Sequence, residues 1–129
     1  AIDADFSKID LQNLNIFNAG NDCVDFSGGN YRIKYLKFIN CGDKGVSAGG
    51  NSAVFLSNSH IKNALIGIVA KDGSKVVADK IKLLNVGVCL GAYNKKQEFG
   101  GGLIKVNDIY DCPANYYFTH NGSNIKFLQ

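Results

Sequence analysis

Apolar and polar residues alternate along this chain in short bursts of three to five residues. The first repeat shows three such bursts, at Ile9/Leu11, Leu14/Ile16 and Val24/Phe26. A period of two places successive side chains on opposite faces of an extended strand, whereas a helix would repeat every three to four residues. The pattern therefore predicts many short strands separated by bends.

The succession of bursts recurs about every 22 residues. Four stretches begin at Ile9, Tyr31, Val54 and Val76. A fifth begins at Ile104, if about six residues are inserted after Ala92, and a sixth begins at Ile125. The first four stretches share an asparagine column, separated by 22, 23 and 22 residues, at Asn18, Asn40, Asn63 and Asn85.

Such a unit cannot bury its inner face alone, but stacked units can, with neighbouring backbones about 4.8 Å apart. We expect an all-β fold: a single-stranded right-handed parallel β-helix (solenoid) of about five rungs, with three short strands per rung. Residues 1–129 would form one domain and a fragment of a longer chain. Asparagine tolerates the left-handed backbone of a sharp corner, and its stacked amides would hydrogen-bond inside the coil.

A leucine-rich-repeat solenoid is the alternative fold, because it also has a period in the low twenties and an asparagine ladder. Its LxxLxLxxN pattern is only partly met by LQNLNIFN from Leu11, and the helical second half of such a repeat is missing. A β-sandwich with accidental periodicity is a further alternative.

The asparagine column and the corner pairs Gly28-Gly29 and Gly49-Gly50 resemble the right-handed parallel β-helix superfamily typified by pectate lyases and polygalacturonases. The runs GNDCVDFSGGN and CGDKGVSAGGNS also resemble β-helix repeats of predicted bacterial surface proteins. The resemblance implies a polysaccharide ligand and a secreted or cell-surface location. The segment NDCVD is similar to the Asp-Asp segment of polygalacturonases, but the family's His-Gly pair and Arg-x-Lys segment are absent.

Composition narrows the choice of partners. The net charge is only +3 and the basic residues are spread along the chain, which argues against a nucleic-acid patch. No apolar run approaches the roughly 20 residues of a membrane-spanning helix, so we expect no membrane insertion. The absence of a CxxC motif argues against zinc. The disulfide state stays open for Cys23, Cys41, Cys89 and Cys112; a Cys23–Cys41 link is one option, and Cys89 is expected to point outward.

Outward positions of the third strand in each rung predict a flat strip with small residues at its centre. An extended polysaccharide would find apolar contact with aromatic faces and hydrogen bonds from charged and polar groups there. The outward set includes Ser47, Gly49, Val69, Cys89, Gly91, Tyr117 and Thr119. The predicted substrate-binding residues are Asp25, Ser27, Ser47, Lys71, Asp72, Tyr93, Lys95, Lys96 and Tyr117.

Three acidic residues, Asp22, Asp25 and Asp43, lie within two rungs. They allow three interpretations: a corner ladder in which Lys44 neutralises the stacked charge, an acid–base pair for a glycosidic bond, or oxygen ligands for Ca²⁺. No cofactor is expected under the first two. The candidate catalytic residues are Asp22, Asp25, Asp43 and Glu98.

The segment 94–102, NKKQEFGGG, is an insertion at one corner. Insertions at one corner of a solenoid tend to lie on the binding side, so this loop is expected to wall one side of the strip, with Glu98 as a general acid or base.

Taken together, the sequence predicts a carbohydrate-associated module that binds a polysaccharide on the third-strand face. Any enzymatic activity would be that of a polysaccharide lyase or glycoside hydrolase. The alternative is a non-catalytic structural or adhesive segment that self-associates end to end, since uncovered terminal rungs leave strand edges unpaired.

Overall fold

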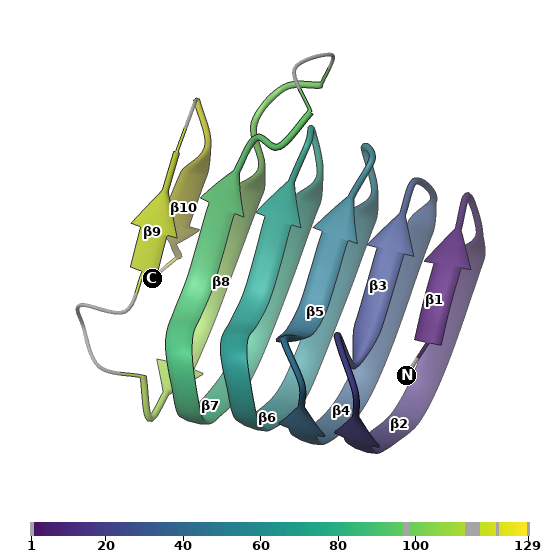
Figure 1. The fold of residues 1–129 in the computed structure, drawn as a ribbon, viewed down its shortest axis with the longest axis vertical. Coiled ribbons are helices and arrows are strands. Elements are labelled where there is room, and N and C mark those ends of the chain that lie inside the picture. Colours follow the sequence, from purple (N-terminus) through teal and green to yellow (C-terminus); the bar gives the residue numbers. More distant parts are fainter. Residues whose placement is uncertain (1, 97–98, 113–116, 121, 129) are drawn as a thin grey trace.

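The computed structural model describes residues 2–96, 99–112, 117–120 and 122–128, and these form a β-solenoid of about five turns (Figure 1). No helix occurs among them. The strands are β1 (Ile2–Asp5), β2 (Lys8–Ala19), β3 (Val24–Ser27), β4 (Asn30–Cys41), β5 (Lys44–Gly49), β6 (Ala53–Lys71), β7 (Lys75–Tyr93), β8 (Leu103–Tyr110), β9 (Tyr117–Thr119) and β10 (Asn124–Phe127).

Every strand pair is parallel, and each turn lies in register on the next. One column joins the residues that open the sequence repeats: Ile9, Tyr31, Val54, Val76, Ile104 and Ile125. Val76 pairs with Ile104, 28 positions further on, which confirms an insertion of about six residues in a 22-residue repeat. The predicted fold class and repeat boundaries are therefore confirmed.

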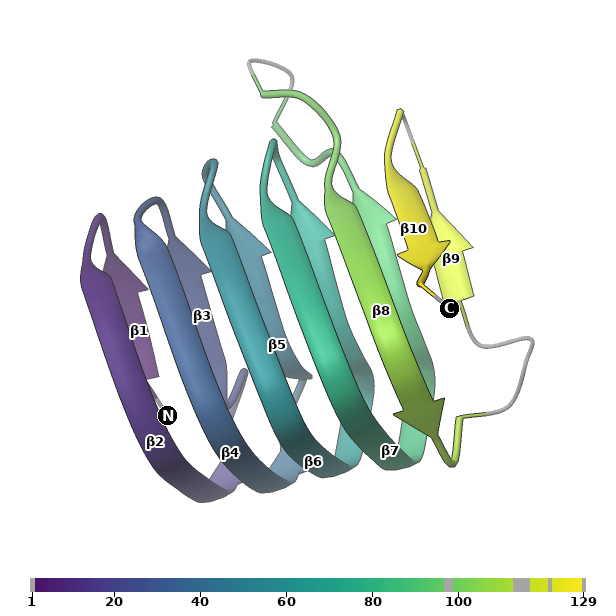
Figure 2. The same cartoon turned by 180° about the vertical axis from the view of Figure 1, so that it is seen from behind.

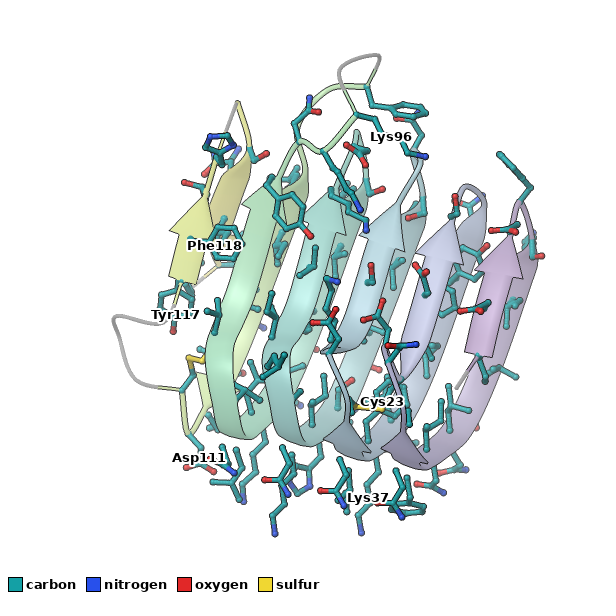
Figure 3. The ribbon with its side chains drawn as sticks, viewed as in Figure 1. Cys23, Lys37, Lys96, Asp111, Tyr117 and Phe118 are labelled. Atoms are coloured by element: carbon teal, nitrogen blue, oxygen red, sulfur yellow. A yellow bond between two sulfur atoms is a disulfide. The ribbon has the colours of Figure 1, made fainter. Side chains whose placement is uncertain are left out.

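Each full turn has three arms, which give the solenoid three outer faces. The back sheet contains β2, β4, β8, β10 and the first arms of β6 and β7 (Figure 2). The front sheet contains β1, β3, β5, β9 and the last arms of β6 and β7 (Figure 1). The second arms form the lower edge that joins the two sheets, and Lys37 projects from it (Figure 3). In β6 and β7 the three arms continue through the bends as one strand of 19 residues.

The inward side chains stack in columns and fill the coil. Ile33, Leu56 and Ala78 follow one another in a column and are fully buried. Phe26 stacks face to face on Tyr31, with ring centroids 4.0 Å apart, and so joins the front sheet to the back sheet. Burying such apolar columns supplies the main stabilising free energy, at roughly 25 cal/mol for each Å² removed from water.

The asparagine column forms a hydrogen-bonded ladder, as predicted. The Nδ2 atoms of Asn40, Asn63 and Asn85 each donate to Oδ1 of the preceding asparagine, at 2.7–2.8 Å. All four asparagines have positive φ, between 56° and 61°. The expectation that the amides lie inside the coil is wrong, because these hydrogen bonds are on the exposed surface of the corner. The left-handed backbone turns the side chain away from the packed interior.

Two disulfides join adjacent turns. Cys23 is bonded to Cys41, and Cys89 is bonded to Cys112. The expectation that Cys89 points outward is wrong, because its side chain is fully buried. Cys89 lies one residue before the inward Leu90, at a position where the arm enters the front sheet and its alternation has not yet begun.

Candidate functional site

The outward residues of the front sheet form two rows that run along the solenoid axis. The first row contains Asp3, Asp25, Ser47, Val69, Gly91 and Phe118. The second row contains Asp5, Ser27 and Gly49, followed by Lys71 and Tyr93. Carboxylates therefore lie at one end of the front sheet and aromatic rings at the other.

The centre of these rows is covered, contrary to the predicted open strip of small residues. Ser47 and Val69 are fully buried although they face outward. The Lys71 stem lies over Gly49, where a Cβ atom would come within 3.0 Å of Lys71 Cε. The Phe118 ring lies over Gly91 in the same way, 2.6 Å from where a Cβ atom would stand. The small residues thus make room for long side chains that lie flat on the sheet.

The aromatic end differs from the prediction by one residue. Tyr117 pairs with the inward Leu90, and Phe118 pairs with the outward Gly91. Tyr117 and Thr119 therefore do not face outward as predicted, and Tyr117 packs against the core. Phe118 takes the outward place and stacks on Tyr93, with centroids 5.6 Å apart and ring planes 13° apart (Figure 3).

Two of the three candidate carboxylates are engaged by Lys44. Asp22 Oδ1 accepts the backbone N–H of Lys44 at 3.0 Å and lies 3.7 Å from its Nζ. Asp43 Oδ2 accepts from the same Nζ at 3.0 Å. Burial lowers the pKa of Lys44, but the hydrogen bond to Asp43 and the charges of both aspartates raise it further, so the net shift is upward. This arrangement supports the ladder interpretation of the acidic cluster.

Asp25 stands apart from that ladder. Its carboxylate forms no hydrogen bond or ion pair with the side chains that the structure describes, and burial raises its pKa against the opposing charge of Lys71. Burial, followed by repulsion from Lys44, lowers the pKa of Lys71. The two groups carry opposite shifts on one face, which is the electrostatic setting of an acid–base pair. Between them lies Ser47, whose buried Oγ has no hydrogen-bond partner among the described residues.

The calcium interpretation finds no support in the geometry. Among the residues that the structure describes, no three His, Cys, Asp or Glu side chains gather as metal ligands. Asp22 and Asp43 instead bind the Lys44 ammonium, and Asp25 lies on the sheet beside Lys71.

Asp72 has a structural role in addition to its predicted place near the ligand. It is buried, and its Oδ1 accepts the backbone N–H groups of Lys95 and Lys96, both at 2.7 Å. Asn94 Nδ2 donates to the Phe99 carbonyl at 2.6 Å. These bonds fix both ends of the insertion. Glu98, the predicted general acid or base, lies outside the described residues.

The insertion borders a groove at the upper corner of the front sheet, which we call the corner groove. Lys96 projects from the insertion above the sheet (Figure 3). The residues that line the groove are Asp5, Phe6, Ser27, Gly28, Gly29, Gly50, Asn51, Lys96 and Phe99. Phe6 is highly exposed and Phe99 is half-buried, so two aromatic rings stand over a glycine floor bordered by polar groups.

Of the predicted binding residues, Ser27 and Lys96 lie in the corner groove, whereas Asp25, Lys71 and Tyr93 lie on the adjoining sheet. Lys95 contributes its backbone to the Asp72 contact. Sequence reasoning missed Phe6, Phe99 and Phe118 as site residues. Counting the register forward from Ala92 through the inward Leu90 would have identified Phe118, but nothing in the sequence shows which way the insertion folds.

A comparison of the chain with family models, with curated proteins and with solved structures finds no match. The described part of the chain also contains no helix that is long and apolar enough to cross a membrane. The class of this protein is therefore defined by its fold, the parallel β-solenoid, and any function must be argued from its surface.

Proposed function

We propose that this protein is a carbohydrate-associated β-helix module that binds a polysaccharide along the corner groove and the adjoining front sheet. The observation that carries the proposal is the corner groove itself, in which Phe6 and Phe99 stand over Gly28, Gly29 and Gly50. Aromatic faces offer apolar contact to the C–H face of a sugar ring. Asp5, Ser27, Asn51 and Lys96 supply the hydrogen-bonding groups that hydroxyl-rich rings need.

The geometry suits a polymer more than a single small molecule. The rows of the front sheet run along the axis and lead from Asp5 past Lys71 to the stacked pair of Tyr93 and Phe118. An extended ligand would therefore meet similar chemistry at successive turns. The floor remains shallow because glycine and serine occupy the rows.

Two further observations support an extracellular role within the pectate lyase-like superfamily that the sequence resembles. All four cysteines are paired, and disulfides are rare in reducing compartments. Lys44 holds two of the three candidate carboxylates, which favours binding over cleavage. We therefore assign the module to secreted or cell-surface carbohydrate recognition.

A glycan array followed by calorimetry tests the proposal. Wild-type protein is expected to bind at least one class of polysaccharide, and Phe99→Ala and Lys96→Ala are expected to weaken that binding at least tenfold, since each removes a wall of the groove. Phe17→Ala is the matched control, because Phe17 is an exposed phenylalanine outside the groove and its loss should leave binding unchanged. An array without binding would overturn the proposal and favour a structural segment.

A further inference from the structure

A row of positive charge lies on the lower edge of the solenoid, away from the corner groove. Lys37, His60 and Lys82 occupy the same outward position on three successive turns, in β4, β6 and β7. Lys62 lies two residues after His60 on the same arm. We call these four residues the basic row, and Lys37 marks its place in Figure 3.

The alignment of like charges has an energetic cost. Residues paired directly across parallel strands lie about 4.8 Å apart, and like charges at such positions repel each other. Asp111 is the one carboxylate found near the row in the described structure, 3.5 Å from Lys82 Nζ. Lys37 and Lys62 form no ion pair among the described residues. An anion bound along the row would relieve this repulsion.

The centre of the row contains an unsatisfied polar atom. His60 is half-buried, and its Nε2 is buried without a hydrogen-bond partner in the described part of the chain. Burial, then the charges of Lys82, Lys37 and Lys62, lower the pKa of His60, whereas Asp111 raises it by a smaller amount. The imidazole is therefore held neutral by the same lysines that a bound anion would neutralise.

From this geometry we infer that the basic row is a second binding site, which takes a linear anionic polysaccharide lying along the solenoid axis. One charged group on each sugar would match one cationic side chain on each turn. Binding would draw a proton onto His60, because an anion nearby favours the charged imidazole. Single-stranded nucleic acid would use a broader positive groove with aromatic stacking along it, which this narrow row at the lower edge does not provide.

Calorimetry with a dextran sulfate oligosaccharide tests the inference, with unsulfated dextran of the same length as the neutral arm. Sulfate stays ionised throughout, so a change in affinity between pH 7.5 and pH 5.5 reports on the protein. We expect the sulfated probe alone to bind, to bind more tightly at pH 5.5, and to lose affinity with added salt. Lys37→Ala and Lys82→Ala should each weaken binding roughly threefold to fivefold, as expected for exposed ion pairs.

Two histidine variants separate a proton-coupled site from general attraction. His60→Asn should bind the sulfated probe with little dependence on pH, whereas His120→Asn, at an exposed position outside the row, should keep the wild-type dependence. Phe99→Ala should have no effect, since the corner groove is a different site. Equal losses in His60→Asn and His120→Asn, or tighter binding of a single-stranded oligonucleotide of equal charge, would overturn the inference.

Discussion

The side-chain amide of Asn63 donates a 2.8 Å hydrogen bond to Oδ1 of Asn40, one turn earlier in the solenoid. An amide can both donate and accept, so a column of asparagines forms a chain of hydrogen bonds that a column of serines or aspartates could not form in the same way. Each asparagine also adopts a left-handed backbone. The residue type therefore serves the corner twice, through its backbone and through its side chain.

Position in the ladder should determine how much each asparagine contributes. Asn63 makes two ladder bonds, whereas Asn85 makes one. Glycine accepts the left-handed backbone without strain, so Asn63→Gly and Asn85→Gly compare the side-chain bonds alone. We expect urea denaturation to show a larger loss for Asn63→Gly, by about 0.5–1 kcal/mol, the net worth of one hydrogen bond. Equal losses would show that the ladder bonds add nothing to stability.

A second corner column was not evident from the sequence. Asn13, Tyr35, Asn58, Lys80 and Asp108 occupy it, and all five have positive φ. The asparagine ladder was predictable because one residue type recurs at a fixed spacing. This column was not, because tyrosine and lysine rarely adopt a left-handed backbone and give no local signal. Their conformation is imposed by the register of neighbouring turns.

Lys80→Asn should stabilise the protein. Lys80 has a φ of 58°, and asparagine tolerates this region better than lysine. We expect the free energy of unfolding to rise by up to about 1 kcal/mol. The reciprocal change Asn58→Lys, at the equivalent corner of the preceding turn, should lower it by a similar amount. A loss of stability in Lys80→Asn would show that the corner is not strained.

Removing the Asp72 carboxylate should release the insertion. Asp72→Ala leaves the N–H groups of Lys95 and Lys96 without their acceptor, whereas Asp72→Asn keeps an oxygen in the same place. Bonds to a charged acceptor are worth about 1.5–3 kcal/mol, and we expect a loss of about 2 kcal/mol in Asp72→Ala and less in Asp72→Asn. Limited proteolysis should cut within residues 94–102 in Asp72→Ala first. Resistance equal to that of the wild type would contradict this anchoring role.

Reduction of the disulfides should destabilise the protein markedly. The Cys23–Cys41 and Cys89–Cys112 bonds close segments of 18 and 23 residues. Cross-links over such segments are worth about 3 kcal/mol each. The double variants Cys23→Ser/Cys41→Ser and Cys89→Ser/Cys112→Ser should each lower the free energy of unfolding by about that amount. The second pair should also speed hydrogen exchange in β9. Unchanged exchange there would show that the bond does not hold the last turn.

The candidate site was predicted less well than the fold, for physical reasons visible at single residues. Alternation identified the outward faces of Asp25, Lys71 and Tyr93, since strand periodicity requires it. It could not show that Lys71 lies over Gly49, because a long side chain chooses its direction from neighbours two turns away. The assignment of Tyr117 was wrong by one position, because the register after the insertion depends on residues with no repeat signal.

Asp25 is predicted to cost stability at neutral pH. Its pKa is raised, chiefly by burial, so the folded state binds a proton more tightly than the unfolded state does. Stability therefore falls as pH rises from the ordinary aspartate pKa of 3.8 through the raised value of the folded protein. Asp25→Asn removes the charge and should raise the free energy of unfolding at pH 7. The gain should be small, because solvent screens a partly exposed group.

The pH dependence of that gain distinguishes titration from a packing effect. At pH 3, where the carboxyl is protonated in both states, Asp25→Asn and the wild type should have nearly the same free energy of unfolding. Asp22→Asn serves as the comparison, because Asp22 binds Lys44 and its loss should destabilise the protein at pH 7 instead. Urea denaturation at several pH values measures both. If Asp25→Asn were destabilising at pH 7, the carboxylate would have to be stabilised by Lys71 more than burial penalises it.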